Sequence, residues 1–556
     1  MHPGRSEHAP SRAPRAVAVL CLLAATFVSG CLWDTKETPR AATPADVGYD
    51  PTTVHVLGVT VQNLTVTSWD GTTKLAVRAY VPALSGDARP PLVVFLHGWG
   101  NNKESYESGE SYPVANPVGT GLPTGVNHLR EFADAGFLAV AYDARGFGQS
   151  NGLATVAGPA EMADLHSILV WAQSTFPTNG RVGVIGASYG AGQAFNALAD
   201  DPLVTTVVPM YGWVDLYQAL VTGNVPKLEW AQFLYLYGQG GAGHYDPIIH
   251  EWYSDLYLRG VPAPAGEDLS TLRSQMDARS SLARLPASHK PLLVCQGMEE
   301  SLFPQVDQAW TNAGGFTCAV VFRGGHGSAA PGCWARALDW FAFFLQGYDT
   351  GVDAWPALET VDAASDAVTN YAAFPDPTPA VYHLRSGELY QGPASEAPFA
   401  IQQTVAANPL EEPGALWDQV GMPTNALPDG LRQDPSALTF QSPLLTGGTL
   451  VGAPELTLTL HGESTTPYQV AGTLLVLHED GTSQIVSRGA AAALRQDDVA
   501  DGALHLRFHW TKMDLTPGDR IVLKVASNDP AWWMPLLNNY AVTFDGRSEL
   551  SLPILA

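Results

Sequence analysis

The fold of this chain is decided by residues 180–190, which read Gly180-Arg181-Val182-Gly183-Val184-Ile185-Gly186-Ala187-Ser188-Tyr189-Gly190. The pattern predicts a short buried strand that breaks into Gly-x-Ser-x-Gly and continues as a helix to Ala199. Such a turn is strained and the helix passes close to neighbouring strands, so glycines flank Ser188. Ser188 is therefore predicted to be a nucleophile, with the Tyr189 N–H and the helix N-terminus directed at a carbonyl oxygen. An ordinary glycine-rich loop between a strand and a helix is the alternative interpretation.

Strands and helices alternate on both sides of this stretch. Residues 91–96, 137–142 and 204–209 are continuous apolar runs, which are typical of strands buried on both faces of a parallel sheet. Residues 59–81 alternate apolar and polar side chains about Asp70-Gly71, as in a β-hairpin. The alternation predicts an α/β fold, a doubly wound parallel sheet with right-handed crossovers.

The 556 residues are too many for one hydrophobic core, and the pattern changes twice along the chain. An aromatic-rich, mostly helical insert at about 210–285 is predicted to cover Ser188 and shape a substrate pocket, although most of its aromatic residues would form its own core. The helical patterns end at the proline-rich run 374–379. We therefore expect an α/β-hydrolase domain over 51–373 and a C-terminal β-sandwich or jelly-roll domain over 374–556.

The N-terminus has the features of an export signal. Three arginines within residues 1–15 precede an apolar stretch, 16–28, which is too short to span a bilayer comfortably. The following Val28-Ser29-Gly30-Cys31 resembles the lipobox of prokaryotic lipoproteins, in which Cys31 is lipidated and becomes the new N-terminus. Residues 1–30 are thus predicted to be a lipoprotein signal peptide and 31–50 a tether, giving an exported lipoprotein anchored in the membrane at the cell surface. A secreted protein or an uncleaved anchor is the alternative.

The charge balance limits the partners. The chain has 54 acidic and 29 basic residues, a net charge of −25, and no basic cluster in its mature part, which argues against binding nucleic acid.

Cys295, Cys318 and Cys333 lack metal-ligand spacing. Cys295 and Cys318 are predicted to be small core residues, and one disulfide bond among the three cysteines is the alternative. No metal or cofactor is predicted. The expected partner is a small ester, amide or peptide substrate. The sequence does not decide between a monomer and a homo-oligomer.

A serine hydroxyl needs a base to activate it and a carboxylate to orient that base. In the chain order typical of α/β-hydrolases the predicted triad is Ser188, Glu300 and His326. His326 lies on a glycine-flanked loop after the last predicted strand of the sheet, and Glu300 follows the strand before it. Because these loops lie at the carboxyl ends of parallel strands, they are expected to converge. Other candidates for the acid are Glu299, Asp307 and Asp215.

Two further loops follow predicted strands. His97-Gly98-Trp99 stands where hydrolases of this kind build the second half of the oxyanion hole, so the Trp99 backbone N–H is the candidate donor and His97 is predicted to be structural. Asp143 and Arg145 begin a glycine-rich loop without a Gly-Lys-Ser/Thr nucleotide motif, and we predict that they form an ion pair that braces it.

These motifs together resemble the Xaa-Pro dipeptidyl-peptidase and cocaine-esterase superfamily, relatives of peptidase family S15. The resemblance extends over roughly residues 55–556 and rests on five segments, namely His97-Gly98, 142–148, 186–190, 297–304 and 325–327. It implies an α/β-hydrolase with a C-terminal β domain and a Ser-acid-His triad. The family usually has Asp where Glu300 stands, and many members take an oxyanion donor from a Tyr side chain rather than from a backbone N–H.

The predicted function is a serine hydrolase that cleaves ester or amide bonds through an acyl-enzyme. A dipeptidyl-peptidase would need carboxylates in the insert to hold a free N-terminal amine, and Glu229, Glu251 and Asp255 are candidates. The alternative from another class is a non-catalytic surface protein that binds glycans on a hydrolase scaffold. In that case Trp532 and Trp533 would stack on a sugar rather than pack in a core.

Overall fold

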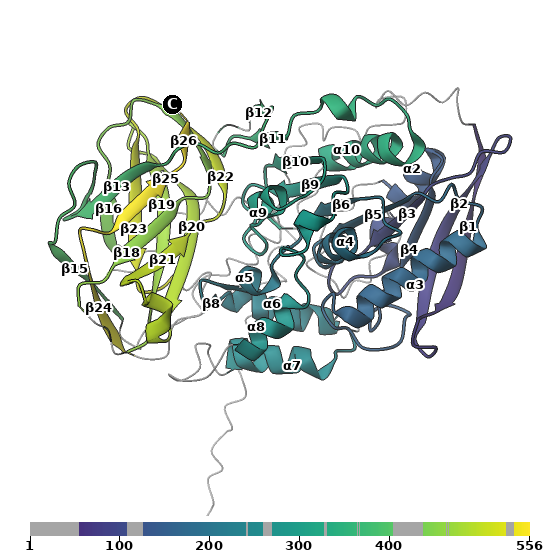
Figure 1. The fold of residues 1–556 in the computed structure, drawn as a ribbon, viewed down its shortest axis with the longest axis horizontal. Coiled ribbons are helices and arrows are strands. Elements are labelled where there is room, and N and C mark those ends of the chain that lie inside the picture. The colour runs from purple at the N-terminus through teal and green to yellow at the C-terminus, as the bar shows by residue number, and fades with distance from the viewer. Residues whose placement is uncertain are drawn as a thin grey trace, which may run out of the picture.

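A computed structural model describes residues 55–107, 126–240, 243–258, 270–326, 331–403, 437–529 and 539–555, apart from 364, 366, 463 and 465. The predicted signal peptide and tether, and Trp532 and Trp533, lie outside these residues. The described chain forms two large sheets, one flanked by helices and one in a β-rich domain beside it (Figure 1). Among the described helices, none has the length and apolar character that a membrane span requires.

The first sheet has ten strands in the order β1-β2-β4-β3-β5-β6-β9-β10-β11-β12. Its strands are β1 Val56–Thr67, β2 Lys74–Leu84, β3 Leu92–Leu96, β4 Leu138–Tyr142, β5 Val182–Ala187, β6 Thr206–Met210, β9 Leu292–Gly297, β10 Thr317–Phe322, β11 Leu358–Val361 and β12 Val368–Tyr371. The strands from β4 to β11 are parallel, whereas β1, β2 and β12 join antiparallel. Every residue of β3, β4 and β6 is buried, which is why these strands are continuous apolar runs.

Helices cover both faces of this sheet. One core contains the buried sides of α3, α4 and α9, and the other contains those of α2 and α10. The elements are η2 Lys103–Tyr106, α2 His128–Asp134, α3 Pro159–Thr175, α4 Tyr189–Asp200, η4 Leu285–Ala287, α9 Val306–Thr311, α10 Pro331–Phe341, η5 Ala342–Gln346 and η6 Val352–Ala354. Because the central strands are parallel, the loops that follow them lie along one edge of the sheet, as in a doubly wound fold.

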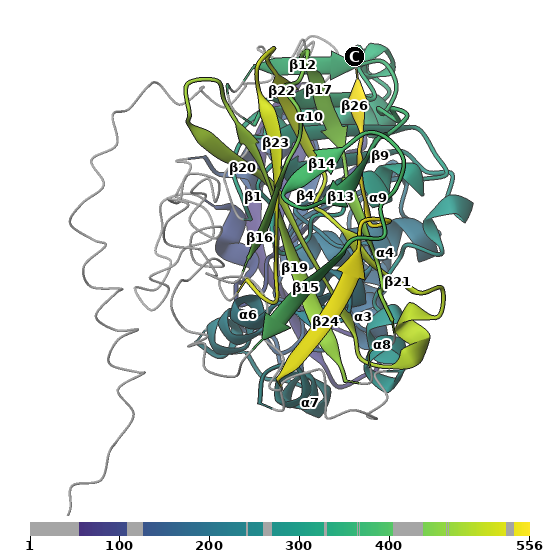
Figure 2. The same ribbon diagram turned by 90° about the vertical axis from the view of Figure 1, so that its left-hand side faces the viewer.

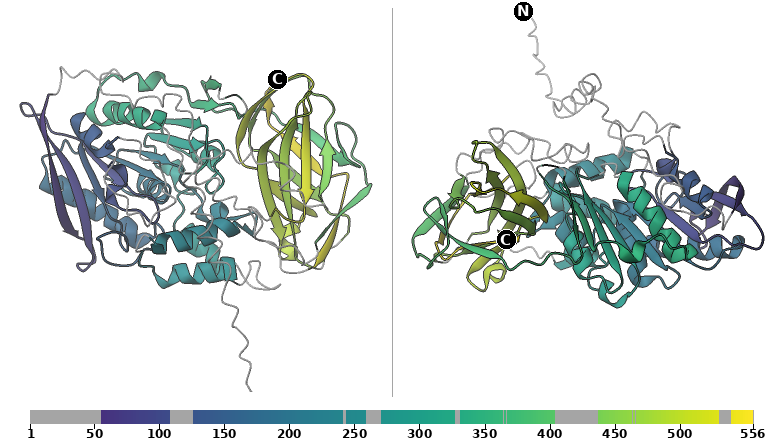
Figure 3. Two further views of the ribbon diagram at one scale, coloured as in Figure 1. Left: turned by 180° about the vertical axis from the view of Figure 1, so that it is seen from behind. Right: turned by 90° about the horizontal axis from the view of Figure 1, so that it is seen from above.

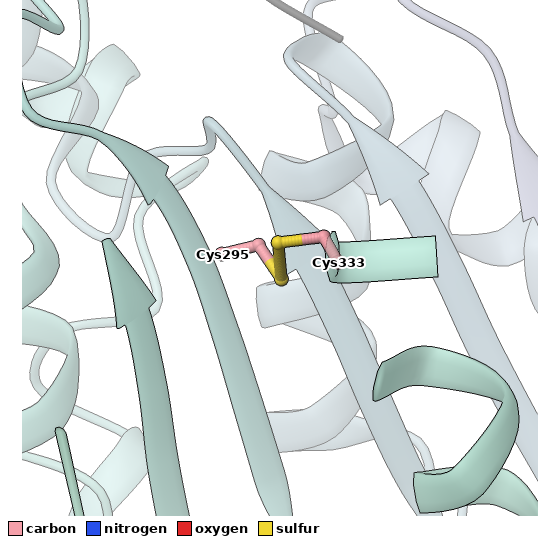
Figure 4. The surroundings of a disulfide bond; sticks show 2 residues. All are labelled: Cys295 and Cys333. Carbon is pink, nitrogen blue, oxygen red and sulfur yellow. A yellow bond between two sulfur atoms is a disulfide. The ribbon is translucent and has the colours of Figure 1, made fainter. Parts of the chain in front are cut away.

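A disulfide joins the sheet to a covering helix. Cys295 on β9 is bonded to Cys333 on α10 (Figure 4), while Cys318 is free and buried. Cys295 and Cys318 are both buried core residues, as predicted, and the disulfide that the sequence left open joins Cys295 to Cys333. Cys333 lies in the first turn of α10, which packs over β9 and brings together two sulfur atoms whose residues are 38 positions apart in the sequence.

The insert between β6 and β9 forms a cap. It consists of α5 Leu216–Leu220, β7 Val221–Thr222, β8 Val225–Pro226, α6 Leu228–Gly240, α7 Pro247–Tyr253, η3 Ser254–Leu258 and α8 Ser270–Asp277. Buried aromatic residues of the cap, such as Trp230, form one apolar cluster with residues that follow the strand ends. The latter include Trp99, Tyr189 and Phe303. These aromatic side chains thus join the cap to the loops that carry the predicted site.

The β-rich domain spans residues 380–555 (Figure 2). Its main sheet has nine strands in the order β20-β19-β23-β16-β14-β13-β25-β18-β21, with smaller sheets β15-β24 and β22-β17-β26. Its elements are β13 Ala380–Arg385, β14 Glu388–Tyr390, β15 Pro398–Gln403, β16 Leu438–Gln441, β17 Gly448–Gly452, β18 Glu455–Thr459, β19 Tyr468–Leu477, β20 Ser483–Ala493, η9 Gln496–Val499, β21 Ala503–Arg507, β22 Thr511–Leu515, β23 Arg520–Ala526, β24 Tyr540–Asp545, β25 Glu549–Leu552 and β26 Ile554–Leu555.

This β-rich domain lies beside the α/β domain (Figure 3) and packs against the cap and α9. Val225 of the cap shares an apolar cluster with Ala492 of β20, whose N–H donates to the Gly223 carbonyl over 2.7 Å. Arg507 at the end of β21 forms an ion pair with Asp307 on α9. Because α9 follows directly on the loop that carries Glu300, the β-rich domain contacts the surroundings of the predicted site.

Candidate active site

Ser188 stands at a strained turn between β5 and α4. Its φ is +56° and its ψ −116°, a conformation that residues other than glycine rarely adopt. The Ser188 N–H donates to the Met210 carbonyl over 2.8 Å. A Cβ on Gly190 would lie 2.0 Å from the Leu96 oxygen, and one on Gly186 would lie 2.4 Å from the Gly190 oxygen. The structure therefore confirms the predicted strand-turn-helix and explains why glycine occupies both flanking positions.

The three predicted triad residues lie in one hydrogen-bonded row. His326 Nε2 is 2.8 Å from Ser188 Oγ, and His326 Nδ1 is 2.8 Å from Glu300 Oε2. The other carboxylate oxygen, Oε1, accepts the N–H groups of Leu302 at 2.7 Å and Phe303 at 3.0 Å. A carboxylate accepts from Nδ1–H, which leaves Nε2 as the acceptor for the serine hydroxyl. This arrangement is the one that general-base activation of a serine needs.

Aromatic rings surround the imidazole. The His326 ring makes edge-to-face contacts with three aromatic rings. The centroid distances are 5.3 Å to Trp230, 5.4 Å to Phe303 and 6.0 Å to Tyr211. His326 and Glu300 are each only 2% exposed. The pair is thus held in a low-dielectric environment, in which its charge-assisted hydrogen bond is stronger than in water.

The other candidate acids have different partners. Glu299 pairs with Arg323 at 2.9 Å, and its other carboxylate oxygen accepts the Gly324 N–H. Asp307 pairs with Arg507 of the β-rich domain, and Asp215 caps α5 by accepting the Gln218 N–H at 3.0 Å. Of the four carboxylates considered from the sequence, Glu300 is the one bonded to His326.

The two predicted oxyanion donors lie on segments that run next to the serine. Tyr189 is the first residue of α4, so its N–H has no acceptor within the helix. The loop after β3 runs beside the serine, because a Cβ on Gly98 would lie 3.8 Å from Ser188 Cβ. The Trp99 ring in that loop packs edge-on against Tyr189 at 5.3 Å, and its Nε1 donates to the Leu234 carbonyl of α6 over 2.8 Å.

His97 connects two strand-end loops. Its Nε2 accepts the Ala144 N–H over 3.0 Å, and its Nδ1 bonds the Gly98 carbonyl at 2.8 Å. Complete burial lowers the pKa of His97, which favours the neutral ring that these two bonds require. The structure thus supports the predicted structural role.

The predicted ion pair between Asp143 and Arg145 is wrong. Asp143 accepts from the backbone N–H of Lys103 at 2.7 Å and from its Nζ at 3.0 Å. Arg145 makes a two-pronged pair with Asp164 of α3, at 2.6 and 2.7 Å. The fold brings each residue a better-oriented partner from elsewhere in the chain, and both pairs still brace the loop.

Sequence reasoning missed the residues that hold the acid loop from the cap. Lys227, just before α6, donates from Nζ to the carbonyl oxygens of Ser301 at 2.5 Å and Leu302 at 2.9 Å. Trp230 Nε1 donates to Ser301 Oγ over 2.9 Å. A lone lysine before an aromatic helix carries no recognisable motif, so only the fold reveals these contacts.

The cap carboxylates proposed for binding an amine differ in exposure. Glu251 on α7 is exposed and Asp255 on η3 is half-buried, while the side chain of Glu229 lies outside the described residues. In the part of the chain that the structure describes, no group of three or more His, Cys, Asp or Glu side chains is arranged to hold a metal ion.

Comparison with known proteins finds a family match over less than half of the chain. Residues 70–311 match the sequence model of the X-Pro dipeptidyl-peptidase (S15) family. Two curated Escherichia coli proteins, both described as an uncharacterized 31.7 kDa protein in the traX-finO intergenic region, are 32% identical over 151 residues, which is 27% of this chain. The match covers 46% of the length of these relatives, so the chain spans about half of them.

Several solved structures are similar over most of the chain. A CocE/NonD family hydrolase from Staphylococcus aureus has a TM-score of 0.66 and 15% identity, with 89% of this chain and 94% of that chain covered. An aminopeptidase from a Thaumarchaeota archaeon has a TM-score of 0.65 and 15% identity, with 95% and 100% covered. An alpha-amino acid ester hydrolase has a TM-score of 0.63 and 15% identity, with 95% and 100% covered.

These likenesses confirm the fold, an α/β-hydrolase followed by a C-terminal β-rich domain. Together with the family match they confirm the resemblance noted in the sequence motifs. They also support a general class of function, that of a hydrolase acting on ester or peptide bonds.

Proposed function

We propose that this chain, whose residues 70–311 match the sequence model of the X-Pro dipeptidyl-peptidase (S15) family, is a serine hydrolase that cleaves ester or amide bonds through an acyl-enzyme. The observation that carries the proposal is the row from Ser188 Oγ through His326 to Glu300, with two successive contacts of 2.8 Å. Both contacts lie in the range of good hydrogen bonds and connect loops from three separate strand ends.

In the proposed reaction, Ser188 Oγ attacks the substrate carbonyl while His326 Nε2 takes the hydroxyl proton. The imidazolium that forms is stabilised by Glu300, whose position is fixed by the Leu302 and Phe303 N–H groups. His326 then returns the proton to the leaving alcohol or amine, and the same ring activates water to hydrolyse the acyl-enzyme.

The backbone N–H groups of Tyr189 and Trp99 stabilise the negative oxygen of the tetrahedral intermediate. The positive end of the α4 dipole adds to this effect, because Tyr189 is in the first turn of that helix. Loss of one such donor typically costs roughly 3–4 kcal/mol of transition-state stabilisation.

The substrate pocket is proposed to lie between the cap and the strand-end loops. The cluster that contains Trp99, Tyr189, Trp230 and Phe303 joins these two regions and is largely apolar. It therefore favours substrates with an apolar acyl or leaving group near the scissile bond.

The first test compares the chain from residue 32 onward with its Ser188→Ala variant. The substrates are p-nitrophenyl butyrate and Ala-Pro-p-nitroanilide. Ester turnover that disappears in Ser188→Ala would support the esterase type of activity, and dominant anilide turnover would support a dipeptidyl-peptidase. If neither substrate is turned over and Ser188 takes no fluorophosphonate label, the proposal fails and the glycan-binding alternative gains support.

The choice of acid has its own matched test. Glu300→Gln keeps the shape of the side chain but removes the charge that stabilises the imidazolium, so kcat should fall by about 10³-fold or more. The neighbouring Glu299→Gln is the control, because Glu299 pairs with Arg323 and should leave most of the activity intact. Equal losses in the two variants would contradict the assignment.

We further infer that the enzyme is exported and tethered to the membrane by a lipid on Cys31. The support is the lipobox-like run 28–31 after an apolar segment. Cells that express the full chain should incorporate radioactive palmitate into it and retain it in the membrane fraction. Cys31→Ser should abolish both, and an unlabelled, secreted wild-type chain would overturn the inference.

A further inference from the structure

Lys227 is a buried lysine directly before helix α6 of the cap. Its side chain is only 2% exposed, and its backbone carbonyl accepts the Ala231 N–H over 2.9 Å while its own N–H donates to the Leu220 carbonyl. A lysine is rarely buried to this extent unless its ammonium has partners. Here the ammonium is directed at the acid loop, where Nζ donates to the carbonyl oxygens of Ser301 and Leu302.

The same two peptide groups hold the triad acid. The Ser301 carbonyl and the Leu302 N–H belong to one planar peptide group, and the Leu302 carbonyl and the Phe303 N–H belong to the next. Lys227 Nζ binds the two oxygen ends at 2.5 and 2.9 Å. Glu300 Oε1 accepts from the two nitrogen ends at 2.7 and 3.0 Å. Two peptide dipoles therefore lie between an ammonium and a carboxylate, aligned favourably with both.

We propose that Lys227 is a positioning residue for the triad, which orients and polarises the two peptide groups that hold Glu300. The inference rests on the proposed serine hydrolase mechanism. Hydrogen bonds in series strengthen one another, so the ammonium makes the two N–H groups better donors to Glu300. Since Oε1 is held in this way, Oε2 is fixed where His326 Nδ1 donates to it.

A second contact from the same helix turn supports this role. Trp230 lies one turn after Lys227, and its Nε1 donates to Ser301 Oγ over 2.9 Å. The Trp230 ring also packs against the His326 ring at 5.3 Å. The start of α6 thus contacts both the acid loop and the base.

The β-rich domain places a histidine within the electrostatic range of Lys227. His509, between β21 and β22, is half-buried, and the Lys227 charge acts on its pKa. Burial lowers the pKa of His509 well below its ordinary value, and the charges of Lys227 and Arg507 lower it further. A neutral His509 adds no second positive charge near Lys227.

Lys227→Met tests the proposal, because it keeps the length of the side chain and removes the ammonium. Loss of charge-assisted hydrogen bonds should lower kcat by about 10- to 100-fold, with KM changed by less than about threefold. Lys290→Met is the matched control, since Lys290 also donates to two backbone carbonyls, those of Leu198 and Asp201, but away from the triad. It should retain the wild-type kcat.

A charge-rescue experiment separates positioning from a purely structural role. Lys227→Ala should regain at least part of its kcat when ethylammonium chloride is added, whereas sodium chloride at the same ionic strength should have no effect. Lys227→Arg, which keeps the charge, should retain more activity than Lys227→Met. Near-UV circular dichroism identifies folded variants, and if Lys227→Met does not fold, the Ala and Arg variants decide.

The outcomes distinguish this inference from the proposed function. A wild-type kcat in folded Lys227→Met, or no recovery of folded Lys227→Ala with the amine, would overturn the role of Lys227 while the loss of activity in Ser188→Ala still supported the hydrolase. Full turnover in Ser188→Ala would instead overturn the proposed function itself.

Discussion

The closest packing in the candidate site is at Gly190, and it leads to a sharp prediction for Gly190→Ala. The added Cβ would lie 2.0 Å from the Leu96 oxygen, 2.6 Å from the Leu96 carbonyl carbon and 2.8 Å from Leu96 Cβ. Ordinary contact begins at 3.4 Å, so the first of these distances is about 1.4 Å too short. The start of α4 must therefore move away from β3 by about that amount.

The end of β3 cannot easily move instead. The Leu96 oxygen also accepts the Tyr106 hydroxyl over 2.7 Å, and the Tyr106 oxygen accepts the Ala187 N–H over 3.1 Å. Any shift of Leu96 would thus pull on the residue before Ser188. Because a displacement of 1 Å in a catalytic site can cost about 10²-fold in rate, kcat/KM should fall by roughly that factor. Overpacking should also lower the free energy of unfolding by about 1–3 kcal/mol.

The assay measures kcat/KM on p-nitrophenyl butyrate and the thermal unfolding midpoint. Gly58→Ala and Gly240→Ala are matched controls, since a Cβ at either position meets nothing within 4 Å. Both should keep wild-type activity. If Gly190→Ala also kept wild-type kcat/KM and melting temperature, the turn would not be as closely packed as described, and the reasoning from backbone contact would be refuted.

Three further predictions concern stability. Replacing both Cys295 and Cys333 by Ala should lower the unfolding free energy by about 4 kcal/mol, because the disulfide spans 38 residues, and an unchanged denaturation midpoint without reductant would contradict this. Burial raises the pKa of Asp339 from 3.8 to about 7, so the folded chain binds more protons between these values and this group makes stability fall as pH rises through that window. Asp339→Asn should therefore melt higher than the wild type at pH 8 and equally at pH 4, and a difference independent of pH would argue against the effect. Arg145→Met leaves the buried Asp164 carboxylate without its guanidinium, which should cost about 3–5 kcal/mol in chemical denaturation, and a loss below about 1 kcal/mol would mean that the pair contributes little.

The parts of the site that were predictable are those encoded locally. The Gly-x-Ser-x-Gly run between an apolar strand and a helix identifies Ser188 because the backbone conformation itself requires those residues. His326 follows from its place on a glycine-flanked loop after an apolar run, and parallel strands bring such loops to one edge of the sheet. Period and spacing are sufficient for inferences of this kind.

Pairings between distant segments were not predictable. Asp143 and Arg145 are two residues apart on one loop, which makes a pair between them look favourable in the sequence. In the structure Asp143 bonds Lys103, and Arg145 bonds Asp164 on a helix 19 residues further on. The bond between Cys295 and Cys333 depends in the same way on how α10 lies over β9.

The choice of the triad acid lies between these two cases. Strand order places a carboxylate after β9, but Glu299 and Glu300 are adjacent, and the sequence has no period that tells them apart. What separates them is the course of the following backbone, which turns the Leu302 and Phe303 N–H groups back onto Glu300 while Glu299 faces Arg323. The Glu300 carboxylate accepts these two N–H groups through Oε1 and the His326 Nδ1–H through Oε2. The acid is therefore determined by which carboxylate accepts the backbone N–H groups of the loop. That loop is in turn held by hydrogen bonds from Lys227 of the cap.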